Sequence, residues 1–159
     1  VPIFYNHKNT GRPEGFYESV FITKYLDSPN QPLFPFGYGL SYTTFEDSEI
    51  QMEDKQLTRD GKLNVSVKVK NTGKYKGTET VQLYIRDLVA SVTRPVKELK
   101  SFRKVELKPG EEKKVEFVIT EKDLRFWNDK KQFISEPGKF HLFIGTDSEN
   151  VKKAEFVLL

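Results

Sequence analysis

LNVSVKVK, residues 63–70, alternates apolar and polar side chains without a break. Successive side chains of a β-strand point to opposite faces of its sheet, so this alternation predicts a strand with one buried and one exposed face. Similar rows follow at residues 81–85, 115–119, 140–144 and 154–158, where every second residue is apolar. The chain from the first row onward is therefore built on the two-residue period of β-structure.

Turn-forming segments separate these rows, as in Lys-Pro-Gly-Glu at residues 108–111. One row is less regular, because Phe102 interrupts the alternation within residues 97–107, and this predicts a β-bulge near Ser101. About seven short strands with this spacing are typical of a two-layer sandwich. We therefore predict an all-β fold over residues 45–159, an antiparallel β-sandwich of immunoglobulin or fibronectin type III-like character.

The composition narrows the classes of function. The 159 residues carry 26 Lys and Arg against 23 Asp and Glu, a net charge of +3 that is spread along the chain. This weak, dispersed excess does not predict a nucleic-acid partner, and no apolar run is long enough to predict membrane insertion. The chain has no cysteine, which excludes disulfides, thiol catalysis and cysteine-based zinc sites.

Residues 32–45 (PLFPFGYGLSYTTF), which we call the connector, contain five aromatic residues, two prolines and two glycines. This density of proline fits neither a regular helix nor a central strand, so the connector is expected to be irregular. Its aromatic side chains are either a cover for the domain's own core or a surface that docks on another domain. We favour docking and expect some of the candidate interdomain docking residues to be unusually exposed: Phe34, Phe36, Tyr38 and Tyr42.

Residues 1–33 contain no convincing periodic element. Residues 6–15 are polar and turn-rich, while residues 16–26 fit a short helix or an extended tail equally well. The chain starts without methionine or a signal peptide, so we expect it to begin inside a longer protein. We assign residues 1–44 to the end of a preceding domain and an aromatic, proline-rich linker, and residues 45–159 to the sandwich.

No catalytic constellation emerges from the sequence. His7 and His141 are the two histidines, and neither has the further ligands that a metal site needs. The many carboxylates include no distinctive pair, and a loop with Asp147 and Glu149 fits a turn capped by its own side chains better than a calcium site. We therefore assign no catalytic, cofactor-binding or metal-binding residue.

Trp127 is the one tryptophan of the chain. It could offer a flat platform on which a sugar ring stacks, or it could close one end of the sandwich together with Phe126. We favour the second interpretation, because a single tryptophan makes a thin binding surface.

The connector and the turns after it resemble the fibronectin type III-like domain at the C-terminus of glycoside hydrolase family 3 enzymes. Residues 5–13 (YNHKNTGRP) resemble the end of the α/β sandwich domain in periplasmic bacterial β-glucosidases of that family. The resemblance covers nearly the whole chain and rests on segments in the family's order: PFGYGLSYTTF (35–45), NTG (71–73), TVQLY (80–84), RPVKELKSF (94–102), LKPGE (107–111), FW (126–127), PGKF (137–140) and IGTDS (144–148).

The resemblance implies a parent enzyme that hydrolyses β-glucosides by a retaining mechanism, with an aspartate nucleophile on a barrel and an acid/base glutamate on a second α/β domain. Neither catalytic motif is present in these residues, so the activity is expected to belong to other domains of the same polypeptide. The resemblance also implies a periplasmic or secreted location. From the residues we expect no cofactor. A second reading stays open, in which the chain is an independent carbohydrate-binding or cell-surface interaction module.

Overall fold

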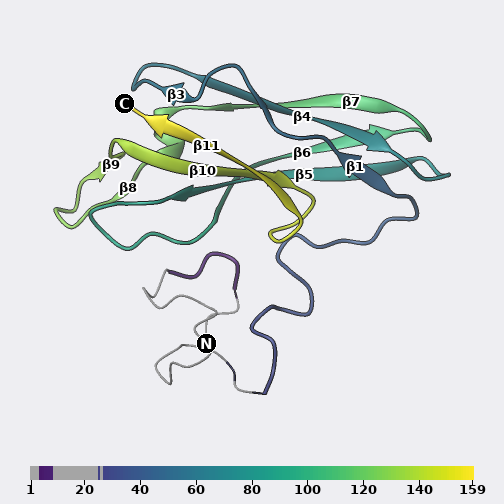
Figure 1. Ribbon diagram of the computed structural model, residues 1–159, viewed down its shortest axis with the longest axis horizontal. Helices are drawn as coiled ribbons and strands as arrows, with labels where there is room; N and C mark the ends of the chain where they lie inside the picture. The colour runs from purple at the N-terminus through teal and green to yellow at the C-terminus, as the bar shows by residue number, and fades with distance from the viewer. Residues whose placement is uncertain (1–3, 9–24, 26) are drawn as a thin grey trace.

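The computed structural model describes residues 4–8, 25 and 27–159, and these residues form eleven strands and one 3-10 turn (Figure 1). In chain order the elements are β1 (Phe45–Asp47), β2 (Gln51–Met52), β3 (Gln56–Leu57), β4 (Leu63–Asn71), β5 (Gly77–Asp87), β6 (Glu98–Leu107), β7 (Glu112–Ile119), the 3-10 turn η1 (Glu121–Leu124), β8 (Phe126–Trp127), β9 (Phe133–Ile134), β10 (Gly138–Gly145) and β11 (Val151–Leu158).

The strands form two facing sheets and a small hairpin. In the first sheet β4 pairs with β7 on one side and with β1 and β2 on the other. The second sheet has the order β3-β11-β10-β5-β6. Because β1 and β2 follow one another along the same edge of β4, they act as one interrupted edge strand. With the six long strands this gives the predicted seven-strand sandwich, to which β3 adds a short parallel pairing with β11.

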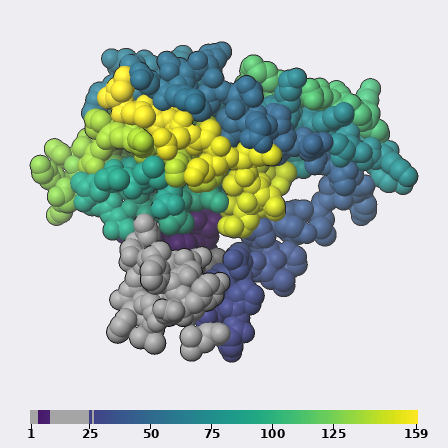
Figure 2. Space-filling model, in the orientation of Figure 1, coloured from purple at the N-terminus to yellow at the C-terminus, as the bar shows by residue number. Residues whose placement is uncertain are grey.

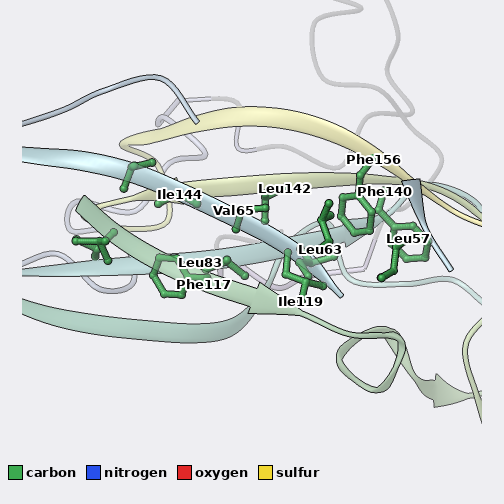
Figure 3. Packing of buried hydrophobic residues seen from close by; sticks show 14 of the residues in the cluster. Leu57, Leu63, Val65, Leu83, Phe117, Ile119, Phe140, Leu142, Ile144 and Phe156 are labelled. Carbon is green, nitrogen blue, oxygen red and sulfur yellow. The ribbon is translucent and has the colours of Figure 1, made fainter. Parts of the chain in front are cut away.

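The core lies between the two sheets, where the apolar rows of the sequence meet. In Figure 3 side chains from β4 and β7 point toward those of β5, β10 and β11. Phe140 and Phe156 stack within it, near Leu57 (Figure 3), with ring centroids 5.3 Å apart. The alternation of residues 63–69 is reproduced directly, because Leu63, Val65 and Val67 are buried and belong to this cluster. The sandwich fold is thereby confirmed.

The predicted bulge in β6 is also confirmed. Leu83 of β5 lies opposite Ser101, but the next residue, Tyr84, lies opposite Leu99. One extra residue, Lys100, therefore sits in β6 at this point. The expected effect of the bulge is wrong, however, because Phe102 stays on the outer face, opposite Gln82, while Leu107 is buried. The bulge instead places Leu99 on the outer face, opposite Tyr84.

The connector lies outside both sheets as an extended path without regular structure (Figure 1). Strand β1 begins at its last residue, Phe45. The expectations for residues 9–24 and 26 fall outside the described part of the chain. Among the residues that the structure does describe, no helix is long and apolar enough to cross a membrane.

Candidate interdomain docking surface

The connector is fixed to the sandwich by a few well-placed hydrogen bonds. The side-chain amide of Gln82, on β5, donates to the carbonyl oxygen of Gly37 at 3.1 Å and also to that of Thr146. The backbone N–H of Ser148 donates to the carbonyl oxygen of Phe36 at 2.9 Å. Gln82 is buried, so its amide spans the space between the connector and the β10–β11 loop.

Aromatic rings reinforce this attachment. Phe36 stacks on Tyr5 with ring centroids 4.2 Å apart, and Tyr5 and Tyr84 form an edge-to-face pair with centroids 5.7 Å apart. Tyr84 points to the outer face of β5 yet has no exposed surface. Its hydroxyl donates to Gln82, and burial raises the pKa of Tyr84, so the phenol stays neutral.

A short N-terminal segment follows the same face. The carbonyl oxygen of His7 accepts the N–H of Val96 at 2.9 Å, and Lys8 forms a β-bridge with Pro95. The interpretation that the connector covers its own domain is therefore correct in part, because the connector does lie on the sandwich. The connector and residues 4–8 cover the outer face of β5, not the core between the sheets.

Several apolar side chains of the connector face away from the sandwich, whereas Thr43 and Phe45 at its end pack against it. Leu33 and Leu40 are almost fully exposed. The expectation of unusual exposure is confirmed for the four predicted docking residues, whose exposed fractions are 64% for Phe34, 47% for Phe36, 44% for Tyr38 and 97% for Tyr42. A contiguous apolar segment exposed to this degree is typical of an interaction surface.

A cavity of about 320 Å³ lies between the connector and the sandwich, bounded by the start of β5 and the β10–β11 loop. Glu79 lines it, and burial raises the pKa of this carboxyl, although the N–H of Thr80 works against the shift. Asp147 lies in the same wall, and its Oδ1 accepts the N–H groups of Glu149 and Asn150 at 2.8 Å. The predicted self-capped turn is confirmed here.

Trp127 lies at a different place and does not close the sandwich. Phe126 is buried beneath the guanidinium of Arg94, which lies 4.4 Å from the ring centre, but Trp127 is 66% exposed. Adjacent residues of a strand face opposite sides, so the two rings cannot share one interior. The end-plug interpretation is therefore wrong for Trp127. The ring of Phe133, a residue that no sequence pattern pointed to, lies with its centroid 5.4 Å from that of Trp127.

Among the described residues, the titratable side chains add no further site. His141 lies half-buried, 3.7 Å from Glu155, and burial lowers the pKa of its imidazole. In the described ranges 4–8, 25 and 27–159, no three His, Cys, Asp or Glu side chains come together in a way that could hold a metal ion.

Known proteins resemble this chain over its full length. The model of the fibronectin type III-like domain family matches residues 79–148. A periplasmic β-glucosidase of Salmonella typhimurium is 49% identical over all of this chain, which covers 21% of that protein. A β-glucosidase of Bacteroides ovatus is 54% identical over 77% of this chain and 16% of its own length.

Solved structures indicate the same family as the sequence relatives. A β-glucosidase of Listeria innocua in complex with isofagomine superposes with a TM-score of 0.91 at 42% identity, over 99% of this chain and 22% of that protein. The chain carries a fibronectin type III-like domain of glycoside hydrolase family 3. This fibronectin type III-like domain, with the connector, spans about a fifth of the length of the relatives from Salmonella and Listeria.

Proposed function

We propose that this chain is the non-catalytic C-terminal domain of a longer family 3 glycoside hydrolase, and that the connector docks it on the catalytic domains of the same polypeptide. The parent enzyme hydrolyses terminal β-D-glucosyl residues by a retaining mechanism. The observation that carries the docking role is the exposure of Phe34, Tyr38 and Tyr42 on a segment that is itself fixed to the sandwich. The relatives' printed names support the activity of the parent.

A fixed aromatic segment suits docking for an energetic reason. Its backbone is held by Gln82 and Ser148 before any contact with another domain, so little conformational entropy remains to be lost on docking. Each large aromatic side chain then contributes about 1.5–3 kcal/mol when it leaves water. The domain can thus hold the catalytic domains in a fixed arrangement.

The same proposal covers the location of the parent enzyme. It also favours a docking domain over an independent interaction module. A periplasmic or secreted location is supported by the relative from Salmonella, whose name places it in the periplasm. An independent interaction module would have no use for the exposed connector, whose apolar side chains would stay in water. We therefore prefer the docking domain to a free-standing module.

Removing the outermost connector side chains tests the docking role. In the longer enzyme we expect the double variant Phe34→Ala/Tyr42→Ala to lose about 2–4 kcal/mol of unfolding free energy, because both rings would be buried against the catalytic domains. In the 159-residue chain the same change should leave the unfolding free energy within about 0.5 kcal/mol, since both rings are exposed there. Urea unfolding of both proteins gives the comparison.

Tyr75→Ala is the control, because Tyr75 is a tyrosine in the β4–β5 turn that is about as exposed as Phe34. It should leave both proteins unchanged. Equal effects of the double variant on the longer enzyme and on the 159-residue chain would contradict docking through the connector.

A further inference from the structure

A pair of exposed aromatic rings stands on the β8–β9 hairpin, residues 126–134. Trp127 and Phe133 lie directly opposite one another in the two strands and share one face. Their ring centroids are 5.4 Å apart and the ring planes are inclined by 43°. Figure 2 shows this hairpin, in light green, at the outer edge of the molecule. The exposed fractions of the two side chains are 66% and 50%.

The base of the hairpin is held rigidly. The hydroxyl of Ser135 donates to Glu121 Oε1 at 2.6 Å, and Arg125 Nε donates to both oxygens of the same carboxylate at 3.0 and 2.9 Å. These bonds lower the pKa of Glu121 and keep it charged. On the inner side Phe126 is buried under Arg94, which fixes the strand that carries Trp127.

The turn at the tip is equally well ordered. Asn128 Oδ1 accepts the N–H groups of Lys130 and Gln132, at 3.0 and 2.9 Å. Lys131 adopts a positive φ of 59°, a conformation that non-glycine residues adopt at a cost of about 1 kcal/mol. The two rings are therefore presented in a fixed arrangement, so a ligand meets a surface that is already formed.

The size and the rim of this surface limit what it can bind. Two aromatic side chains offer at most roughly 400 Å², whereas a stable protein interface needs about 800 Å² from each partner. The turn beside the rings is made of charged and amide side chains: Asn128, Asp129, Lys130, Lys131 and Gln132. An apolar platform beside polar groups matches a small ligand with one flat apolar face and polar edges.

We propose that Trp127 and Phe133 form a binding platform for β-linked glucan chains. In β-linked glucose the hydroxyl groups are equatorial, so each ring has flat faces of axial C–H groups that can stack on aromatic rings, and polar edges that hydrogen-bond. The choice of glucan rests on the proposed function, whereas the presence of a platform rests on the hairpin alone. The platform would hold substrate chains on the accessory domain, away from the connector.

Fluorescence of the 159-residue protein tests the platform, because Trp127 is its one tryptophan. Titration with cellohexaose or laminarihexaose should change the emission saturably. Phe133→Ala keeps the reporter and should weaken the affinity about tenfold or more, as expected for an aromatic anchor. Trp127→Ala, followed by calorimetry, should abolish measurable binding.

Phe102→Ala is the matched control, because Phe102 is a similarly exposed phenylalanine on β6. It should leave the affinity within about twofold, a change well below that of a lost aromatic contact. Near-equal melting temperatures of the three variants would exclude unfolding as the cause, since all three side chains are exposed. The proposal is overturned if neither β-linked hexaose gives a saturable change at millimolar concentration, or if Phe102→Ala weakens binding as much as Phe133→Ala. Because this test uses no catalytic domain, its failure would leave the docking role standing.

Discussion

Asn71 connects three separate parts of the chain through one fully buried side chain. Its Oδ1 accepts the hydroxyl of Thr43 at 2.7 Å and the N–H of Gly73 at 3.0 Å. Its Nδ2 donates to the carbonyl oxygens of Tyr75 and Leu107, at 2.8 and 3.0 Å. The amide thus joins the connector, the β4–β5 turn and the end of β6, and an amide suits this place because it both donates and accepts.

Asn71→Ala should therefore lower the unfolding free energy by about 2–4 kcal/mol, because buried carbonyl and hydroxyl groups would lose their partners. Urea unfolding followed by far-UV circular dichroism measures this. Asn64→Ala, on the exposed face of the same strand, should cost less than about 1 kcal/mol, since it removes one solvent-exposed hydrogen bond to Glu53. Similar losses in the two variants would show that the buried amide has no special role.

At the scale of elements, the connector depends on one glycine for its attachment. Gly37 has a φ of +83°, and a Cβ atom added there would lie 2.1 Å from Gln82 Oε1. Any side chain at this position would therefore displace the amide that holds the connector. Gly39, two residues further on, has no atom within 4 Å of the corresponding position.

Gly37→Ala should destabilise the chain by about 1–3 kcal/mol, through the unfavourable φ and the loss of the Gln82 contact. We also expect faster cleavage within the connector in limited proteolysis, because its attachment is loosened. Gly39→Ala makes the same chemical change in open space and should behave like the unmodified protein. If both variants are cleaved at the unmodified rate, the glycine contact does not hold the connector.

The stability of the whole molecule should depend on pH through Asp87, at the end of β5. Burial raises the pKa of this carboxyl to about 6, although the N–H of Val89 and the charge of Arg94 work against the shift, while Glu136 and Glu98 add to it. Its Oδ1 accepts the Val89 N–H at 3.2 Å, and its Oδ2 is buried without a hydrogen-bond partner in the described residues. Deprotonation therefore leaves a poorly compensated buried charge.

The direction of this pH dependence follows from how many protons Asp87 binds in the folded and in the unfolded state. Between about pH 4 and pH 6 the folded state holds the Asp87 proton and the unfolded state has released it, so this group's contribution to stability falls as pH rises. The fall amounts to about 3 kcal/mol and is complete above the folded pKa. Asp87→Asn should remove it, which thermal unfolding at pH 4, 5, 6 and 7 would detect as a flatter profile. Asp129→Asn, at the exposed hairpin turn, controls for the loss of a negative charge, and an identical flattening there would contradict the assignment.

Much of the fold could be predicted because its signals are local. The alternation of residues 63–69 specifies which side chains enter the core. The place of the bulge in β6 was also predicted, although Phe102, the residue used to infer it, faces outward in regular alternation with Leu107. Exposed rings at Phe34 and Tyr42 were likewise expected, because the aromatic connector was interpreted as a surface that docks on another domain.

The sites were less predictable, because they depend on contacts between distant segments. By alternation Tyr84 belongs to the exposed face of β5, yet Tyr5, which is 79 positions earlier, helps to cover it. Trp127 was expected to close the sandwich, but in β8 it lies on the side that is exposed to solvent. Its partner Phe133 carries no local signal beyond its place in a short strand.

A β-sandwich, its inward rows and an irregular aromatic connector follow from the amino-acid order alone, since periodicity and backbone restrictions act between neighbouring residues. The contacts of Gln82 and Tyr84 with the connector and residues 4–8, and the exposed surface of Trp127 and Phe133, became visible in the folded chain. They could not be predicted because burial of an outward-facing side chain depends on which distant segment lies over it. Which segment covers it depends on hydrogen bonds and packing between distant parts of the chain, and a local sequence pattern does not indicate these contacts.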